Sequence, residues 1–264
     1  MLELIPFVVV LAFLFETMDS SAGMGFGTGL TPLLLLIGYE PLQIVPILLI
    51  SEAITGFTSA FFHNEFENVQ FTFKKKNKET RIMLMIAGIG CVAILISVFI
   101  TYFAIKIDKN TIKTYVAILV LVMGFIGMLN LKAKDRSYKP KVLTAFSALA
   151  GFNKGIGAGG YGPVVMMGQI FSGIYEKTAT AIVSLSEGIV SVVGFGSFLI
   201  VPLLMGQENS IDFVLLPSIF TGGFIAALIS PYMVRVIPNK IWRVVIPVYA
   251  LSIGVYLLLK MYVL

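Results

Sequence analysis

The chain has 264 residues, of which 58% are hydrophobic and only 12% are charged. Soluble domains are about 45–50% apolar and about 25% charged, so this composition excludes a water-soluble globular protein and indicates a bilayer as solvent. The net charge is +5, and the basic residues gather in short stretches between apolar runs, which argues against a nucleic-acid-binding patch. The single cysteine, Cys91, lies inside an apolar run. A disulfide framework or zinc site within one chain is therefore excluded, and we expect no metal and no cofactor.

Six apolar runs have the length of a membrane-crossing helix. About 20 helical residues cross the roughly 30 Å hydrocarbon core of a bilayer. The six expected spans are 41–62, 81–105, 111–131, 177–204, 212–234 and 241–259. The sequence therefore predicts an all-α polytopic membrane protein.

Two further regions, 2–38 and 141–173, are longer than one span, and glycines with neighbouring polar residues interrupt each of them midway. In the second region the apolar piece before the break, 142–152, would form only about 16 Å of helix, which is half a membrane. Non-helical backbone at membrane depth is tolerated only where protein buries it or where it lines a watery cavity. We therefore interpret each region as a broken, re-entrant hairpin beside a cavity.

The basic residues predict the orientation in a bacterial inner membrane. Lysine and arginine concentrate at 74–81 and in the linker 132–140, which we expect in the cytoplasm. The loop 207–210 has no basic residue and is expected outside. With both hairpins re-entrant, these assignments place both termini outside. The basic turn at 106–113 would then also lie outside, which argues against this topology.

The two halves of the chain resemble one another. At an offset of 132 residues Gly23, Gly25 and Gly27 fall on Gly155, Gly157 and Gly159, and after a short insertion Ser51 and Glu52 fall on Ser186 and Glu187. The first repeat, 1–131, and the second, 141–264, each contain a hairpin and three spans. Because the first begins outside and the second inside, we predict inverted-topology repeats, which are typical of secondary transporters with a midplane substrate site.

The two glycine-rich breaks form the predicted substrate site. Residue types that cap helix N-termini precede the glycines, and glycines let a ligand approach unpaired backbone N–H groups. Two opposed half-helix N-termini make a positive spot suited to an anion. The predicted substrate-binding residues are Ser20, Ser21, Gly23, Gly25, Gly27, Asn153, Lys154, Gly155, Gly157, Gly159 and Gly160. The alternative is that the glycines serve only close helix packing.

Lys154 lies at the second break, where a buried ammonium needs a partner. It either neutralises a bound sulfonate, sulfite or carboxylate, or forms a structural ion pair with Asp19, Glu52 or Glu187. These three acids are also candidates for proton coupling, because carboxylates within membranes often relay protons. Their alternative role is to pair with Lys154 or to cap backbone amides.

Two more ionisable residues lie near these segments. Glu16 precedes the first break and is either another cavity acid or only a polar residue near the tip. His63, the single histidine, stands at a span end beside Asn64 and Glu65, so we expect it in a surface loop rather than in a metal site or a proton switch.

This arrangement resembles the TauE/SafE family of membrane transporters, which is associated with export of sulfite and organosulfonates. The resemblance covers nearly the whole chain. It rests on the glycine-rich tips of the two hairpins, GMGFGTGLTP at 23–32 and GIGAGGYGP at 155–163. It also rests on two short polar motifs, SEA at 51–53 and SEG at 186–188. It implies substrate contact at the tip glycines Gly23, Gly25, Gly27, Gly155, Gly157, Gly159 and Gly160. Family tips usually carry a glycine triplet, whereas here the triplets are broken and Lys154 is an addition, which favours an anion.

The sequence thus predicts a secondary transporter, not an enzyme, that exports a small sulfur-containing anion by alternating access, with proton coupling as an option. Two alternatives stay open: an intramembrane hydrolase with a serine and Lys154, and a passive anion channel. The expected partners are the small anionic substrate and the lipid bilayer, with no nucleic acid. A homodimer is one option for the oligomeric state.

Overall fold

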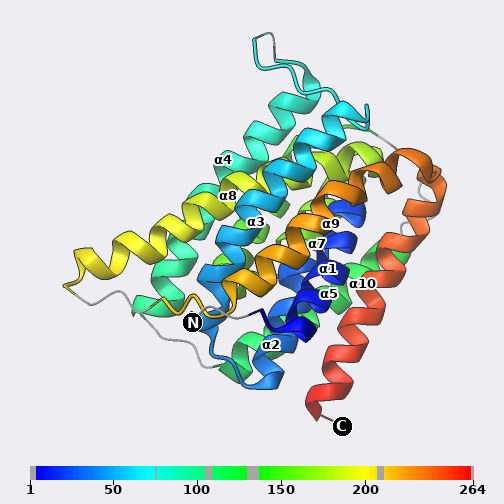
Figure 1. Ribbon diagram of the computed structural model, residues 1–264. Helices are drawn as coiled ribbons and strands as arrows, with labels where there is room; N and C mark the ends of the chain where they lie inside the picture. The colour runs from blue at the N-terminus through cyan, green and yellow to red at the C-terminus, as the bar shows by residue number, and fades with distance from the viewer. Residues whose placement is uncertain (1–3, 75, 105–108, 130–136, 207–210, 263–264) are drawn as a thin grey trace.

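A computed structural model describes residues 4–74, 76–104, 109–129, 137–206 and 211–262. These residues form ten α-helices and two short π-helical turns, and no strand occurs among them (Figure 1). The elements are α1 (Pro6–Ala22), η1 (Phe26–Leu30), α2 (Thr31–Ile37), α3 (Pro41–Glu65), α4 (Lys78–Val98), η2 (Phe99–Ala104), α5 (Lys109–Leu129), α6 (Pro140–Gly157), α7 (Tyr161–Phe171), α8 (Glu176–Leu204), α9 (Leu216–Val236) and α10 (Asn239–Tyr262).

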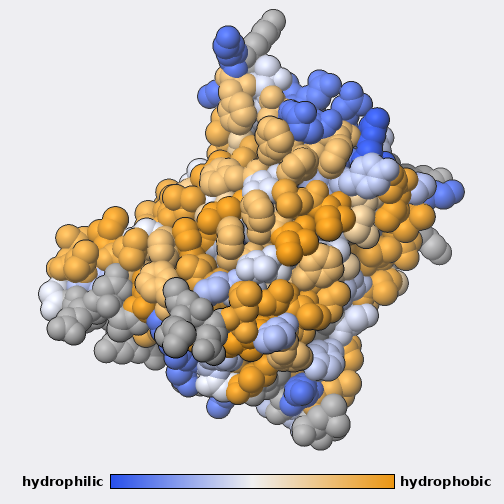
Figure 2. Space-filling model, viewed as in Figure 1, coloured by the Kyte–Doolittle hydropathy of each residue, from blue (hydrophilic) through white to orange (hydrophobic). Residues whose placement is uncertain are grey.

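The apolar runs form long helices, as predicted. Within the described part of the chain, five helices are long and apolar enough to cross a membrane: α3, α4, α8, α9 and α10. The sixth expected span coincides with α5. Apolar side chains cover most of the face seen in Figure 2, and hydrophilic residues gather toward its upper end, around the loop that follows α3. Such a surface needs lipid around it, so the all-α polytopic class is confirmed.

Both interrupted regions are two-part elements. α1 ends at Gly23, whose φ of 71° is in the left-handed region that glycine tolerates, and the chain continues through η1 into α2. α6 ends at Gly157 and is followed by its C-cap residue Ala158, where φ is 54°, and α7 begins at Tyr161. The helix before the second break therefore ends five residues later than the expected piece 142–152, because α6 continues through Gly157.

The N-cap positions predicted before the glycines are wrong, although the Asp19 side chain does accept the backbone N–H of Phe26 at the start of η1. Asn153 and Lys154 lie inside α6, and Asp19, Ser20 and Ser21 lie in the last turns of α1, so none of them stands at a helix N-terminus. Helix propensity disfavours Asn and Gly within α6, but partners on other helices stabilise the extra turn. The residue that precedes α7 is Gly160, with φ 80°.

The helices pair in a way that the two halves share. α1 packs along α9 as α6 packs along α4, and α3 packs against α8 as α5 packs against α10. Exchanging each helix for its counterpart in the other half, α1 for α6 and α3 for α8, leaves this set of neighbours unchanged. The pattern agrees with the predicted internal repeat, whose inversion across a membrane stays a prediction.

The two termini lie toward the same end of the molecule (Figure 1). The backbone N–H of Ile5 donates to Ser218 Oγ at 2.8 Å, so α1 and α9 begin together. The opposite end carries the loop after α3, where Arg235 at the end of α9 pairs with Glu67 at 3.2 Å. The basic loop near Lys74 therefore lies at the end away from the termini, as a topology with two re-entrant hairpins requires.

Candidate functional site

The two breaks lie against each other at the centre of the molecule. The backbone N–H of Gly160 donates to Thr28 Oγ1 at 3.1 Å. A Cβ added to Gly27 would lie 1.9 Å from the carbonyl oxygen of Ala158, and one added to Gly159 would lie 2.8 Å from that of Gly27. Glycine is therefore required here because one backbone packs directly on another. This is the geometry of the close-packing alternative, and substrate contact at these glycines stays a prediction.

The other predicted glycines play different parts. The carbonyl oxygen of Gly23 would lie 2.4 Å from a Cβ on Gly162, so the first break also packs on the start of α7. Gly25 has φ 157°, and a side chain there would meet the Phe15 carbonyl at 2.5 Å. Gly155 faces Ser97 of α4 rather than the other break, and Gly157 ends α6 in a buried position.

Lys154 forms a buried ion cluster with one acid from each half of the chain. Its ammonium lies 2.6 Å from Glu52 Oε2 on α3 and 2.7 Å from Glu187 Oε1 on α8. The three residues are 0%, 2% and 4% exposed. The ammonium also lies 5.3 Å from the ring centroid of Tyr161, a cation–π contact. In this conformation Lys154 is thus in the ion pair foreseen as the alternative to a substrate role.

Two carboxylate oxygens of the cluster accept no hydrogen bond from the described residues. Glu52 Oε1 and Glu187 Oε2 are buried and have no hydrogen-bond partner among the described residues. A Cβ on Gly27 would lie 2.8 Å from Glu52 Oε1, so this free oxygen faces the break. Buried carboxylate oxygens are usually satisfied, so each of these two oxygens can still accept a hydrogen bond from a further donor.

The polar residues of the first break turn back toward their own helix. Ser21 Oγ donates to the Thr17 carbonyl at 2.5 Å, and Ser20 Oγ donates to Glu16 Oε1 at 2.5 Å. Asp19 Oδ1 accepts from the backbone N–H of Phe26 at 3.2 Å, which ties α1 to the start of η1. These three side chains therefore bond within the first break, and substrate contact at Ser20 and Ser21 stays a prediction.

Asn153 faces a helix that the sequence did not associate with it. Its Oδ1 accepts a hydrogen bond from the Tyr115 hydroxyl of α5, while its Nδ2 has no partner among the described residues. Thr28, Tyr115 and Tyr161 are contributors that the sequence pattern did not single out as polar partners. Tyr161 donates to Ser186 Oγ at 3.1 Å, next to Glu187. No local pattern indicates these bonds, because each joins distant segments.

His63 is buried, so its predicted surface position is wrong. It is 0% exposed, its Nε2 lies 2.9 Å from the carbonyl oxygen of Ser20, and its Nδ1 lies 3.0 Å from Asn68 Nδ2. Asn68 in turn donates to the Pro231 carbonyl of α9 at 2.9 Å. The residues after α3 fold back over the helix end, and this network joins the end of α1 to α3 and α9.

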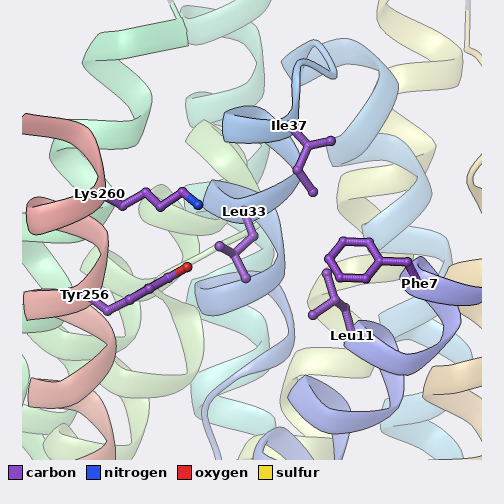
Figure 3. A pocket seen from close by; sticks show the side chains of 6 residues that line it. All are labelled: Phe7, Leu11, Leu33, Ile37, Tyr256 and Lys260. Carbon is purple, nitrogen blue, oxygen red and sulfur yellow. The ribbon is translucent and has the colours of Figure 1, made fainter. Parts of the chain in front are cut away.

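A separate pocket opens at the side of the molecule (Figure 3). It has a volume of about 190 Å³ and lies between α1, α2 and α10. Its lining residues are Phe7, Leu11, Leu33, Ile37, Tyr256 and Lys260. None of them belongs to the Lys154 cluster, so the chemistry at the centre and this side pocket are distinct features.

Removing the acceptor between the two breaks should destabilise the protein. In Thr28→Val the N–H of Gly160 would be buried without a partner, which costs roughly 1–3 kcal/mol. Thr28→Ser keeps the hydroxyl and should stay within about 1 kcal/mol of the parent. Thermal unfolding in detergent measures the difference. Equal unfolding temperatures for the two variants would contradict the hydrogen bond.

A buried ion cluster between two broken elements, within a bundle of membrane-crossing helices, is typical of membrane transporters. The family model described as sulfite exporter TauE/SafE matches residues 8–260, and the chain belongs to this family. The chain is also 27% identical over 243 residues to the probable membrane transporter protein YtnM of Bacillus subtilis (strain 168), covering 86% of this chain and 75% of that protein. No solved structure gives a significant match. The protein is a multi-pass membrane transporter, not an enzyme.

Proposed function

We propose that this transporter exports a small sulfur-containing anion, sulfite or a sulfonate, across the bacterial inner membrane by alternating access. The observation that carries the proposal is the ammonium of Lys154, held at the contact between the two breaks by one carboxylate from each half. Membership of a family described as sulfite exporters supports the class of substrate.

The cluster suggests how binding could drive a conformational change. An oxyanion that enters the site competes with Glu52 and Glu187 for the Lys154 ammonium, and charge-assisted hydrogen bonds replace the ion pair. Because the two acids come from different halves, the loss of either one loosens the contact between the halves. As the breaks part, the N–H of Gly160 is released from Thr28 and becomes a second donor for the anion.

Proton coupling follows from the same charge balance. A carboxylate displaced from Lys154 would be buried without compensation, and binding a proton removes that cost. Asp19, Glu52 and Glu187 are the candidates that the sequence indicates. Asp19 lies on α1 and is partly exposed, whereas the other two acids are buried.

Binding and counterflow test the function. Purified protein should be stabilised against heat by sulfite or sulfonates and less by neutral analogues of the same size. In proteoliposomes, unlabelled substrate inside should accelerate uptake of labelled substrate, since a carrier exchanges faster than it returns empty. Uptake that does not respond to internal substrate would indicate the passive channel, and a chemically altered substrate would indicate the hydrolase.

The proposed orientation predicts where reporters become active. An alkaline phosphatase fused after Leu264 should be active because it lies outside, and one inserted in the basic linker near Lys74 should be inactive. A cytoplasmic reporter at each site should give the opposite result. A cytoplasmic C-terminus would contradict the re-entrant hairpins and the inverted repeat together.

A further inference from the structure

Glu16 of α1 is a buried acid beside the ion cluster. It is 2% exposed. Its Oε1 accepts the Ser20 hydroxyl at 2.5 Å, and its Oε2 has no hydrogen-bond partner among the described residues. The hydroxyl-bearing side chain of Thr55, on α3, lies beside the same carboxyl. Glu16 thus has hydroxyl neighbours and one unused oxygen.

The charged neighbours of Glu16 are mostly acidic. Glu52 on α3 and Glu187 on α8 are close enough to repel it electrostatically, and Asp19 follows it on α1. Among the buried residues that the structure describes, Lys154 is the one lysine or arginine, and both of its hydrogen bonds go to other acids.

Among the side chains that the structure describes, the helices packed on α1 add no buried basic residue to this set, since Lys240 and Lys260 of α10 are exposed near the two ends of that helix. Along α9 the ionisable side chains are Tyr232 and Arg235, and Arg235 pairs with the exposed Glu67. On α10, Tyr249 lies near Asp19. Glu16 therefore faces a group of carboxyls whose single ammonium is already shared by two of them.

The contacts decide which of these acids holds a proton. An ionised carboxylate without a cation is costly to bury, whereas a protonated one is a neutral hydrogen-bonding group. Glu52 and Glu187 are each stabilised as anions by the ammonium at 2.6 and 2.7 Å. Glu16 has only hydroxyls. When protonated, it can donate from Oε2 to Thr55 while Oε1 still accepts from Ser20.

We propose that Glu16 is the proton-binding site of the transporter: it holds a proton in the conformation described here and exchanges it with water when the breaks part. The inference rests on the proposed function and extends it, because it assigns the proton to an acid outside the Lys154 cluster. A proton on Glu16 removes a negative charge beside the anion site. Proton and anion binding therefore reinforce each other, which is the thermodynamic basis of moving them together.

Infrared spectroscopy tests the proton directly and needs no substrate. At neutral pH the parent protein should show the carbonyl stretch of a buried carboxylic acid, and Glu16→Gln should lack it. Glu67→Gln, a change at an exposed acid, should keep it. Glu16→Met serves the same purpose if the amide variant does not fold. A parent without this band, or a Glu16 variant that retains it, overturns the proposal.

A binding titration tests the consequence. Methanesulfonate keeps one negative charge over the working pH range, so its binding reports only the protonation of the protein. Parent protein should bind it more tightly as the pH falls, by roughly 5- to 150-fold in total, the usual range of coupling between two sites. Glu16→Gln should bind with the tight affinity at every pH.

The two measurements separate the possible failures. If Glu16→Gln keeps the pH dependence of the parent, Glu16 is not the coupled site. If the parent binds no sulfonate or sulfite at any pH, the proposed substrate class fails, while the infrared result still decides whether Glu16 holds a proton.

Discussion

Lys154→Met should strongly destabilise the protein, because it leaves Glu52 and Glu187 buried and without a cation. Breaking a buried ion pair by removing one partner typically costs about 3–5 kcal/mol. The matched control is Arg235→Met, since the Arg235–Glu67 pair is exposed, with side chains 52% and 67% accessible. Exposed pairs contribute about 0–1 kcal/mol, so unfolding in detergent should distinguish the two variants clearly.

A compensated variant separates folding from binding. In Lys154→Met combined with Glu52→Gln and Glu187→Gln, no uncompensated charge is buried, so most of the lost stability should return. Anion binding should not return. A charge-assisted hydrogen bond is worth about 1.5–3 kcal/mol, so affinity should fall roughly 10- to 150-fold, while Lys154→Arg keeps part of it. A folded Lys154→Met protein with parental affinity would show that Lys154 is not a substrate ligand.

Features that depend on local sequence were predictable. A run of about 20 apolar residues can satisfy its backbone in lipid only as a helix, so α3, α8 and α9 follow from composition and length. A glycine cluster inside such a run marks a break, and both breaks were found. The general rule that a buried ammonium needs a partner also gave the acids that bind Lys154, although it could not choose between Glu52, Glu187 and Asp19.

Features that depend on contacts between distant segments were not predictable. α6 continues through Asn153 and Gly155 because Tyr115 bonds the first and Ser97 packs on the second. The burial of His63 depends on Ser20 and on the loop that folds over the end of α3. The partners Tyr115, Ser97 and Ser20 lie tens of residues away in the chain, so helix propensity and residue type alone indicated a different local structure.

Gly27→Ala should be the most disruptive change that adds only a methyl group. The new Cβ would lie 1.9 Å from the carbonyl oxygen of Ala158 and 2.8 Å from Glu52 Oε1. Neither atom can move aside easily, because the first belongs to the backbone at the end of α6 and the second to a side chain held by Lys154. The two breaks must therefore separate, which strains the hydrogen bond from Gly160 to Thr28.

Overpacking of this kind typically costs about 1–3 kcal/mol, and the backbone contact puts Gly27→Ala at the upper end of that range or above it. Gly88→Ala is the matched control, because a Cβ on Gly88 of α4 would meet no atom within 4 Å. In a helix interior that change should stabilise the protein by roughly 0.5–1 kcal/mol. Thermal unfolding and counterflow measured on both variants would decide the matter: if Gly27→Ala unfolds and transports as Gly88→Ala does, the two breaks do not pack on one another at this position.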